Sequence, residues 1–76
     1  MIKLYSIKDI VAQEFGPIFQ AKNDDVALRN FHSALAKVPN PTEYELYYLG
    51  DFNIDTGCIN VKPVYLVEDK GVKVGE

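Results

Sequence analysis

Four segments of the chain alternate apolar and polar side chains with the period of two that is typical of a β-strand. The predicted strands are residues 2–8, 15–21, 43–52 and 58–67. In the second of them, Pro17 suits an edge strand or a bulge, because proline has no backbone N–H for a neighbouring strand. The pattern therefore predicts a sheet of about four strands.

Between the second and third strands the apolar spacing changes to three and four residues, as in an amphipathic helix. The stripe consists of Ala27, Phe31, Ala34, Leu35 and Val38. Asn23 can cap the free N–H groups at the start, and Asp24 and Asp25 place negative charge at the positive end of the helix dipole. Pro39 and Pro41 end the segment, since a residue before proline avoids helical geometry. These signals predict a helix over residues 24–37.

The predicted fold class is α+β, an antiparallel sheet of about four strands (β-β-α-β-β) with one helix packed on one face. Residues 54–57 are expected to form a hairpin loop in which Gly57 takes a positive φ. A four-residue loop sets the register of the last two strands. The predicted pairs are Phe52 with Ile59, Gly50 with Val61, Tyr48 with Pro63, and Leu46 with Tyr65. We expect one domain over residues 1–67 and a polar, frayed tail over residues 68–76.

This register divides the last two strands between two faces of the sheet. The more apolar face, expected under the helix, carries Tyr44, Leu46, Tyr48, Phe52, Ile59, Val61, Tyr65 and Val67. The opposite face carries Tyr47, Leu49, Asn60, Lys62, Val64 and Leu66, with Glu45 at its side. That second face is too apolar to remain in water and too polar for a closed core, which is typical of a contact surface.

The candidate contact residues on this surface are Tyr47, Leu49, Asn60, Lys62 and Val64. Two occupants fit them: a second copy of the chain, or bases of a single strand that stack on Tyr47 beside the charge of Lys62. A homodimer ranks above a DNA platform, because Leu49 and Val64 offer burial without positive charge.

Composition limits the classes of function. The chain has 76 residues, 47% of them hydrophobic, and a net charge of −3. This length supports one modest core and excludes a doubly wound nucleotide-binding fold or a barrel enzyme. The eight basic residues are scattered among eleven acidic ones. This distribution disfavours tight binding to duplex DNA and leaves a weaker, stacking-assisted contact with single strands.

No catalytic residue, metal site or cofactor is expected. Cys58 and His32 supply two soft ligands where a structural zinc site needs four, and a single cysteine cannot form an internal disulfide. The chain begins directly with a strand pattern, without the apolar stretch of a signal peptide, and it contains no run of about 20 apolar residues. We therefore expect an intracellular protein.

Two short motifs suggest chemistry and then fail on context. Residues 55–57 have the Asp-Thr-Gly sequence of the aspartic proteases, but a single copy would need a dimer to bring two carboxylates together. Residues 51–55 begin like a calcium loop, yet Thr56 and Lys62 stand where that loop needs glycine and glutamate. His32 has no nucleophile suitably placed beside it. The sequence therefore predicts a protein that is not an enzyme.

Several segments carry a family resemblance through their order and spacing. They are KLYSIKD (residues 3–9), FGPIF (15–19), NDDVALRNF (23–31), PTEYELYYLGDF (41–52) and DTG (55–57). Together they resemble the small nonstructural protein of gokushovirus-type microviruses, which are single-stranded DNA bacteriophages. The segment over residues 38–41 is shorter than in typical members, so a partner contact made by a longer loop would be missing here.

The resemblance implies a non-enzymatic phage accessory protein in the cytoplasm of the infected bacterial host. Such a protein would act on single-stranded DNA, or on the replication and packaging complex, during the switch to single-strand genome synthesis. It implies no particular binding residue. The alternative, favoured by the net acidity, is a dimeric protein-binding module that modulates a host or phage protein without contact with nucleic acid.

Overall fold

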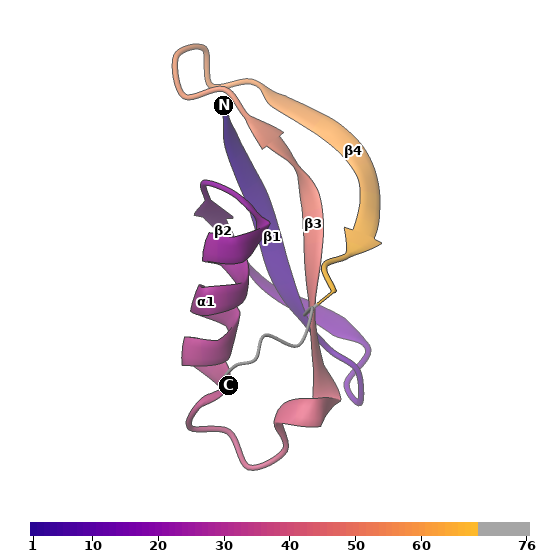
Figure 1. The fold of residues 1–76 in the computed structure, drawn as a ribbon. Coiled ribbons are helices and arrows are strands. Elements are labelled where there is room, and N and C mark those ends of the chain that lie inside the picture. The colour runs from indigo at the N-terminus through magenta and orange to yellow at the C-terminus, as the bar shows by residue number, and fades with distance from the viewer. Residues whose placement is uncertain (69–76) are drawn as a thin grey trace.

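The computed structural model describes residues 1–68 as one antiparallel sheet with a helix on one side (Figure 1). Its elements are β1 (Ile2–Asp9), β2 (Glu14–Ala21), α1 (Asp24–Leu35), the short 3-10 helix η1 (Pro41–Glu43), β3 (Tyr44–Phe52) and β4 (Ile59–Leu66). The strands lie in the order β2-β1-β3-β4. The predicted α+β class is confirmed, and each strand boundary lies within one residue of its prediction. Most of the predicted tail, from residue 69 onward, lies outside the described residues.

Helix α1 begins where the sequence predicts and ends two residues early. The Asn23 side chain accepts a hydrogen bond of 2.9 Å from the Val26 N–H. At the other end, the Ala36 N–H bonds to the Ser33 carbonyl, three residues back, at 3.3 Å. The backbone therefore tightens into a turn before the first proline is reached. Within the predicted apolar stripe, Ala27 and Phe31 are buried, whereas Ala34 is exposed.

The core lies between α1 and the sheet face beneath it, which we call the covered face. The buried apolar residues are Tyr5, Ala21, Ala27, Phe31, Leu46, Tyr48 and Val67. Tyr5 occupies the centre: its ring stacks on Phe19 with centroids 5.9 Å apart and meets Tyr48 edge-on at 5.7 Å. Because Tyr5 and Ser6 point to opposite faces, the alternation predicted for the first strand holds.

The predicted assignment of Phe52, Ile59 and Val61 to the covered face is wrong, because β3 contains a bulge. Leu4 pairs with Gly50, while Tyr5 pairs with Tyr48, so Leu49 is an extra residue in β3. One extra residue reverses the faces of all side chains that follow it. Phe52 therefore lies opposite Ile2 and Ile59, on the side away from α1.

The predicted register of β3 and β4 is confirmed near the hairpin and wrong beyond Gly50. Phe52 pairs with Ile59 and Gly50 with Val61, as expected. Tyr48, however, pairs with Tyr65 instead of Pro63, and Leu46 is not opposite Tyr65. Between these pairs, residues 62–64 of β4 have no partner in this register and lie opposite one residue of β3, Leu49. The physical reason is Pro63, which has no N–H to offer the neighbouring strand.

Candidate functional site

The sheet face that α1 does not cover is the candidate site, and we call it the helix-free face. Cross-strand pairing places the following residues on it: Ile2, Leu4, Ser6, Lys8, Phe15, Ile18, Gln20, Glu45, Tyr47, Phe52, Ile59, Val61 and Leu66. Several of the apolar side chains on this face are exposed to solvent. The face has two ends of different chemistry.

At one end, Lys8, Phe15 and Tyr47 form what we call the aromatic–lysine cluster. The rings of Phe15 and Tyr47 meet edge-on with centroids 5.3 Å apart. The Lys8 ammonium lies 5.6 Å from the Phe15 centroid and 5.9 Å from that of Tyr47. A cation at this distance from a ring is attracted by the ring's electron-rich face. The cluster thus combines positive charge with two aromatic rings on an open sheet surface.

A bulge in β2 brings Phe15 into this cluster. Ser6 pairs with Ile18, while Lys8 pairs with Phe15, so β2 has one more residue than β1 across this stretch. The Ser6 hydroxyl donates a hydrogen bond of 2.9 Å to the Gly16 carbonyl and so satisfies a carbonyl at the bulge. As a result, Phe15 and Phe19 lie on opposite faces, although the spacing of four residues suggests one face.

Glu45 fixes the orientation of the Tyr47 ring. The Tyr47 hydroxyl donates a hydrogen bond of 2.9 Å to the Glu45 carboxylate. This bond, more than burial, raises the pKa of Tyr47, because an ionised phenol would lose the bond and face a negative charge. Tyr47 therefore presents a neutral ring at any physiological pH. The carboxylate also offsets the charge of Lys8, its partner across β1 and β3.

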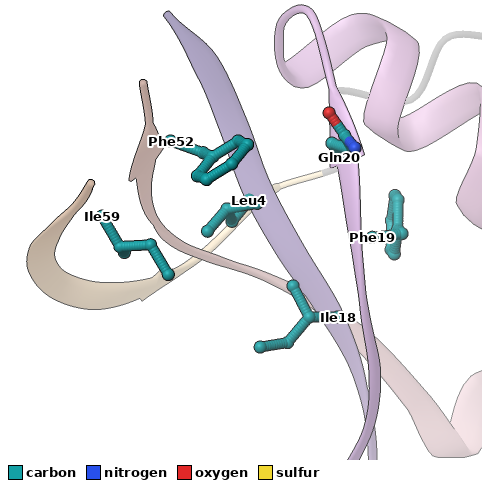
Figure 2. Close-up of a pocket in the computed structure, with 6 residues that line it drawn as sticks. All are labelled: Leu4, Ile18, Phe19, Gln20, Phe52 and Ile59. Atoms are coloured by element: carbon teal, nitrogen blue, oxygen red, sulfur yellow. The ribbon is translucent and has the colours of Figure 1, made fainter. Parts of the chain in front are cut away.

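The other end of the helix-free face is an apolar hollow of about 250 Å³. Figure 2 shows Leu4, Ile18, Phe52 and Ile59 on one side of the strands and Phe19 on the opposite side. The exposed fractions of Ile18 and Ile59 are 64% and 58%, and that of the neighbouring Val61 is 86%. Aliphatic side chains this exposed on both edge strands of a sheet favour contact with another molecule.

The structure does not bring the five predicted contact residues together. Tyr47 lies in the aromatic–lysine cluster, whereas Asn60 pairs with Asp51 on the covered face. Lys62 and Val64 are exposed in the unpaired stretch of β4, and Leu49 is the half-buried extra residue of the β3 bulge.

The sequence pattern did not predict Lys8 and Phe15 as neighbours of Tyr47. The missed signals are glycines inside strand patterns, at Gly16 and Gly50, which often mark bulges.

The covered face has hydrogen bonds between tyrosine hydroxyls and carboxylates. The hydroxyls of Tyr5 and Tyr65 both donate to Asp24, the first residue of α1, and Tyr48 donates to Asp51 at 2.6 Å. Burial first, and these hydrogen bonds second, raise the pKa of Tyr5 and raise that of Tyr48 to about 12. The two bonds to Asp24 join the helix N-terminus to β1 and to the edge strand β4, and the third lies within β3, so we assign all three to stability.

The Asp-Thr-Gly tripeptide forms the turn of the β3–β4 hairpin. The Asn53 side chain accepts hydrogen bonds from the N–H groups of Asp55 and Thr56, at 2.9 and 3.3 Å. Gly57 has φ +79°, as predicted. Turn geometry therefore accounts for the tripeptide.

Within residues 1–68 no group of three or more His, Cys, Asp or Glu side chains is arranged to hold a metal ion. In the same part of the chain, no helix has the length and apolar character needed to cross a bilayer.

Comparison with known proteins gives one family match. Searches of curated proteins and of solved structures return no match. The family described as Phage ORF5 protein matches residues 2–74, nearly the whole chain and all four strands. The chain therefore belongs to the Phage ORF5 protein family and is a bacteriophage protein.

Proposed function

We propose that this phage protein is a non-enzymatic accessory factor that binds single-stranded DNA through the aromatic–lysine cluster. The observation that carries the proposal is the placement of Phe15, Tyr47 and Lys8 together on a sheet face that no helix covers. Every base has a flat aromatic surface, so exposed rings bind single strands with little sequence preference. The Lys8 ammonium adds attraction for the phosphate backbone.

The charge of the chain limits the strength of this contact. With a net charge of −3, the protein repels a polyanion at long range, and Lys8 is the only cation among the described residues assigned to the helix-free face. Binding is therefore moderate and depends more on stacking than on counterion release. A factor of this kind suits a transient role on single strands during genome synthesis or packaging. The resemblance to the gokushovirus-type microviruses, whose genomes are single-stranded, supports that role in the cytoplasm of an infected host.

The test is a fluorescence-anisotropy titration of labelled single-stranded oligonucleotides at low and moderate salt. Removal of one stacking ring costs about 1–3 kcal/mol, so Tyr47→Ala and Phe15→Ala should each weaken binding about 5- to 150-fold. Lys8→Gln should reduce the slope of log affinity against log salt by about 0.7. Tyr65→Ala removes an exposed ring from the opposite side of the sheet and serves as the matched control.

Two results would overturn the proposal. One is the absence of binding by the parent protein at low salt. The other is binding by Tyr47→Ala and Phe15→Ala that equals binding by the parent, with circular dichroism showing that both variants are folded. A loss of affinity in Tyr65→Ala equal to that in Tyr47→Ala would move the contact to the covered side.

A protein-binding module is the second candidate function. The net acidity and the exposed Ile18, Ile59 and Val61 favour it, because aliphatic side chains bind proteins better than they bind nucleotides. In that case the same face would take a host or phage protein. The titration separates the two functions, since a module of this kind shows no salt-dependent binding to single strands.

A further inference from the structure

We propose that a second copy of this chain covers the helix-free face, so that the protein forms a face-to-face homodimer. The two sheets would pack through the same surface on each copy, with the helices on the outside. This arrangement places each sheet between two apolar layers, as in a β-sandwich. It also follows the two-fold symmetry that most homodimers adopt.

The exposed side chains of this face are those that a sheet normally buries. Phe15, Ile18, Ile59, Val61 and Leu66 have exposed fractions between 41% and 86%. They come from β2 and β4, the two edge strands, and so extend across the full width of the sheet. So many exposed apolar side chains on one sheet face are unusual for a protein that stays monomeric.

Charge on the face favours a copy of the chain as the occupant. The chain as a whole carries a net charge of −3, yet the helix-free face carries one positive group, Lys8, and one negative group, Glu45. A second copy therefore meets no net repulsion there. In a two-fold arrangement, the Lys8 of each copy can also face the partner's Glu45. A partner that carries charge of one sign could complement only one of these two groups.

The area of the face is sufficient only if all of it is used. Four strands about 4.8 Å apart and about eight residues long present roughly 500 Å² per copy, or roughly 1,000 Å² for the pair. A biological interface should bury at least about 1,000 Å² with good complementarity. The hollow between Ile18 and Ile59 supplies a concave region beside the projecting Ile18 side chain, so each copy can insert that side chain into the other.

Association through the sheet edges is disfavoured on both sides. Pro17 in β2 and Pro63 in β4 each remove an N–H group, and both strands are irregular at these positions. Prolines and bulges on edge strands block the addition of another strand. The face, rather than an edge, is therefore the surface through which two copies meet.

A dimer that uses the whole face would compete with single-stranded DNA. This one point rests on the proposed function. A dimer of this kind covers Phe15, Tyr47 and Lys8, so a single strand and a second copy compete for the same surface. By linkage, a ligand that binds only the open chain shifts the equilibrium away from the dimer.

Light scattering and sedimentation across micromolar to millimolar protein concentrations test the dimer. The parent should approach twice the chain mass of 8.6 kDa. Val61→Lys and Ile18→Lys should each remain near 8.6 kDa throughout, because an interface would have to bury the new ammonium group. Both positions are well exposed, so a lysine there is solvated in the folded monomer. Val11→Lys, at an exposed position in the β1–β2 turn, should dimerise like the parent.

The proposal is overturned by a parent that stays monomeric at millimolar concentration, or by Val61→Lys and Ile18→Lys that dimerise like the parent. A short unlabelled oligonucleotide added to the parent should lower the dimer fraction, and DNA bound to an intact dimer would rule out the whole-face arrangement. Failure of the proposed function is distinguishable, because light scattering without DNA measures the dimer by itself.

Discussion

The two faces of one sheet differ in how their aromatic side chains are used. On the covered face, Tyr5 and Tyr48 are buried against α1 and their hydroxyls are paired with carboxylates. On the helix-free face, Phe15 is 46% exposed and lies beside a lysine. Both faces are rich in apolar atoms, yet only one has a layer over it. The difference shows that the covered face supplies the core of the chain, whereas the apolar side chains of the helix-free face have no layer over them.

Local irregularities of the backbone create this difference. Without the bulges, strict alternation would put Phe15 with Phe19, and Phe52 with Tyr48, on the covered face. The bulges at Gly16–Pro17 and at Leu49 turn Phe15 and Phe52 to the other side. Two added residues thus transfer two large rings from the covered face to the helix-free face.

The largest expected effect is the contrast between Phe31→Ala and Phe15→Ala. Phe31 is buried against the sheet, so its truncation should lower the free energy of unfolding by about 3–5 kcal/mol. Phe15 is half exposed, so its truncation should cost less than about 1.5 kcal/mol. Urea denaturation of both variants measures the difference. Equal losses would mean that the helix-free face contributes to the monomer core as much as the covered face does.

The second largest effect is expected at Gly50, next to the β3 bulge at Leu49. A Cβ atom at this position would lie 2.5 Å from the backbone carbonyl oxygen of Asn60. Since neither backbone can yield easily, Gly50→Ala should cost about 1–3 kcal/mol. Gly16→Ala is the matched control, because its Cβ would lie 3.4 Å from the nearest atom, the Ile7 carbonyl oxygen. If the two variants have the same midpoint in urea, the close approach of β3 and β4 at Gly50 is absent in solution.

The sequence predicted the elements well and the distribution of side chains between faces only in part. The cap at Asn23, the prolines after α1 and the turn at Gly57 are local signals, and the corresponding boundaries were confirmed within two residues. Faces depend instead on counting residues along a strand, and one bulge reverses every later position. Apart from Gly50, a glycine inside a strand pattern, nothing near Phe52 or Ile59 in the sequence indicates that Leu49 is an extra residue. The same limit explains why Tyr47 was identified as a contact residue and Phe15 was not.

Alkaline pH should weaken the covered face selectively. The folded pKa of Tyr48, about 12, lies above the unfolded value of 10.0, so the folded state keeps a proton that the unfolded state loses. Stability from this group is complete below about pH 10 and falls as the pH rises through about 12. Urea midpoints at pH 8, 10 and 11 measure the fall. Tyr48→Phe should make the fall above pH 10 shallower without removing it, because burial and the bond to Asp24 also raise the pKa of Tyr5. A profile as steep as the parent's would contradict the burial of Tyr48 and its bond to Asp51.

The smallest effects are expected in the hairpin loop, which belongs to neither face. Asn53→Ala removes the acceptor for two backbone N–H groups, so it should cost about 1 kcal/mol. Asp55→Asn keeps the backbone N–H that Asn53 binds, so the unfolding free energy should change by less than about 0.5 kcal/mol. Thermal melts of the two variants give the comparison. If Asp55→Asn proved the more damaging change, or abolished a peptidase activity of the parent, the Asp-Thr-Gly tripeptide would have a role beyond its turn.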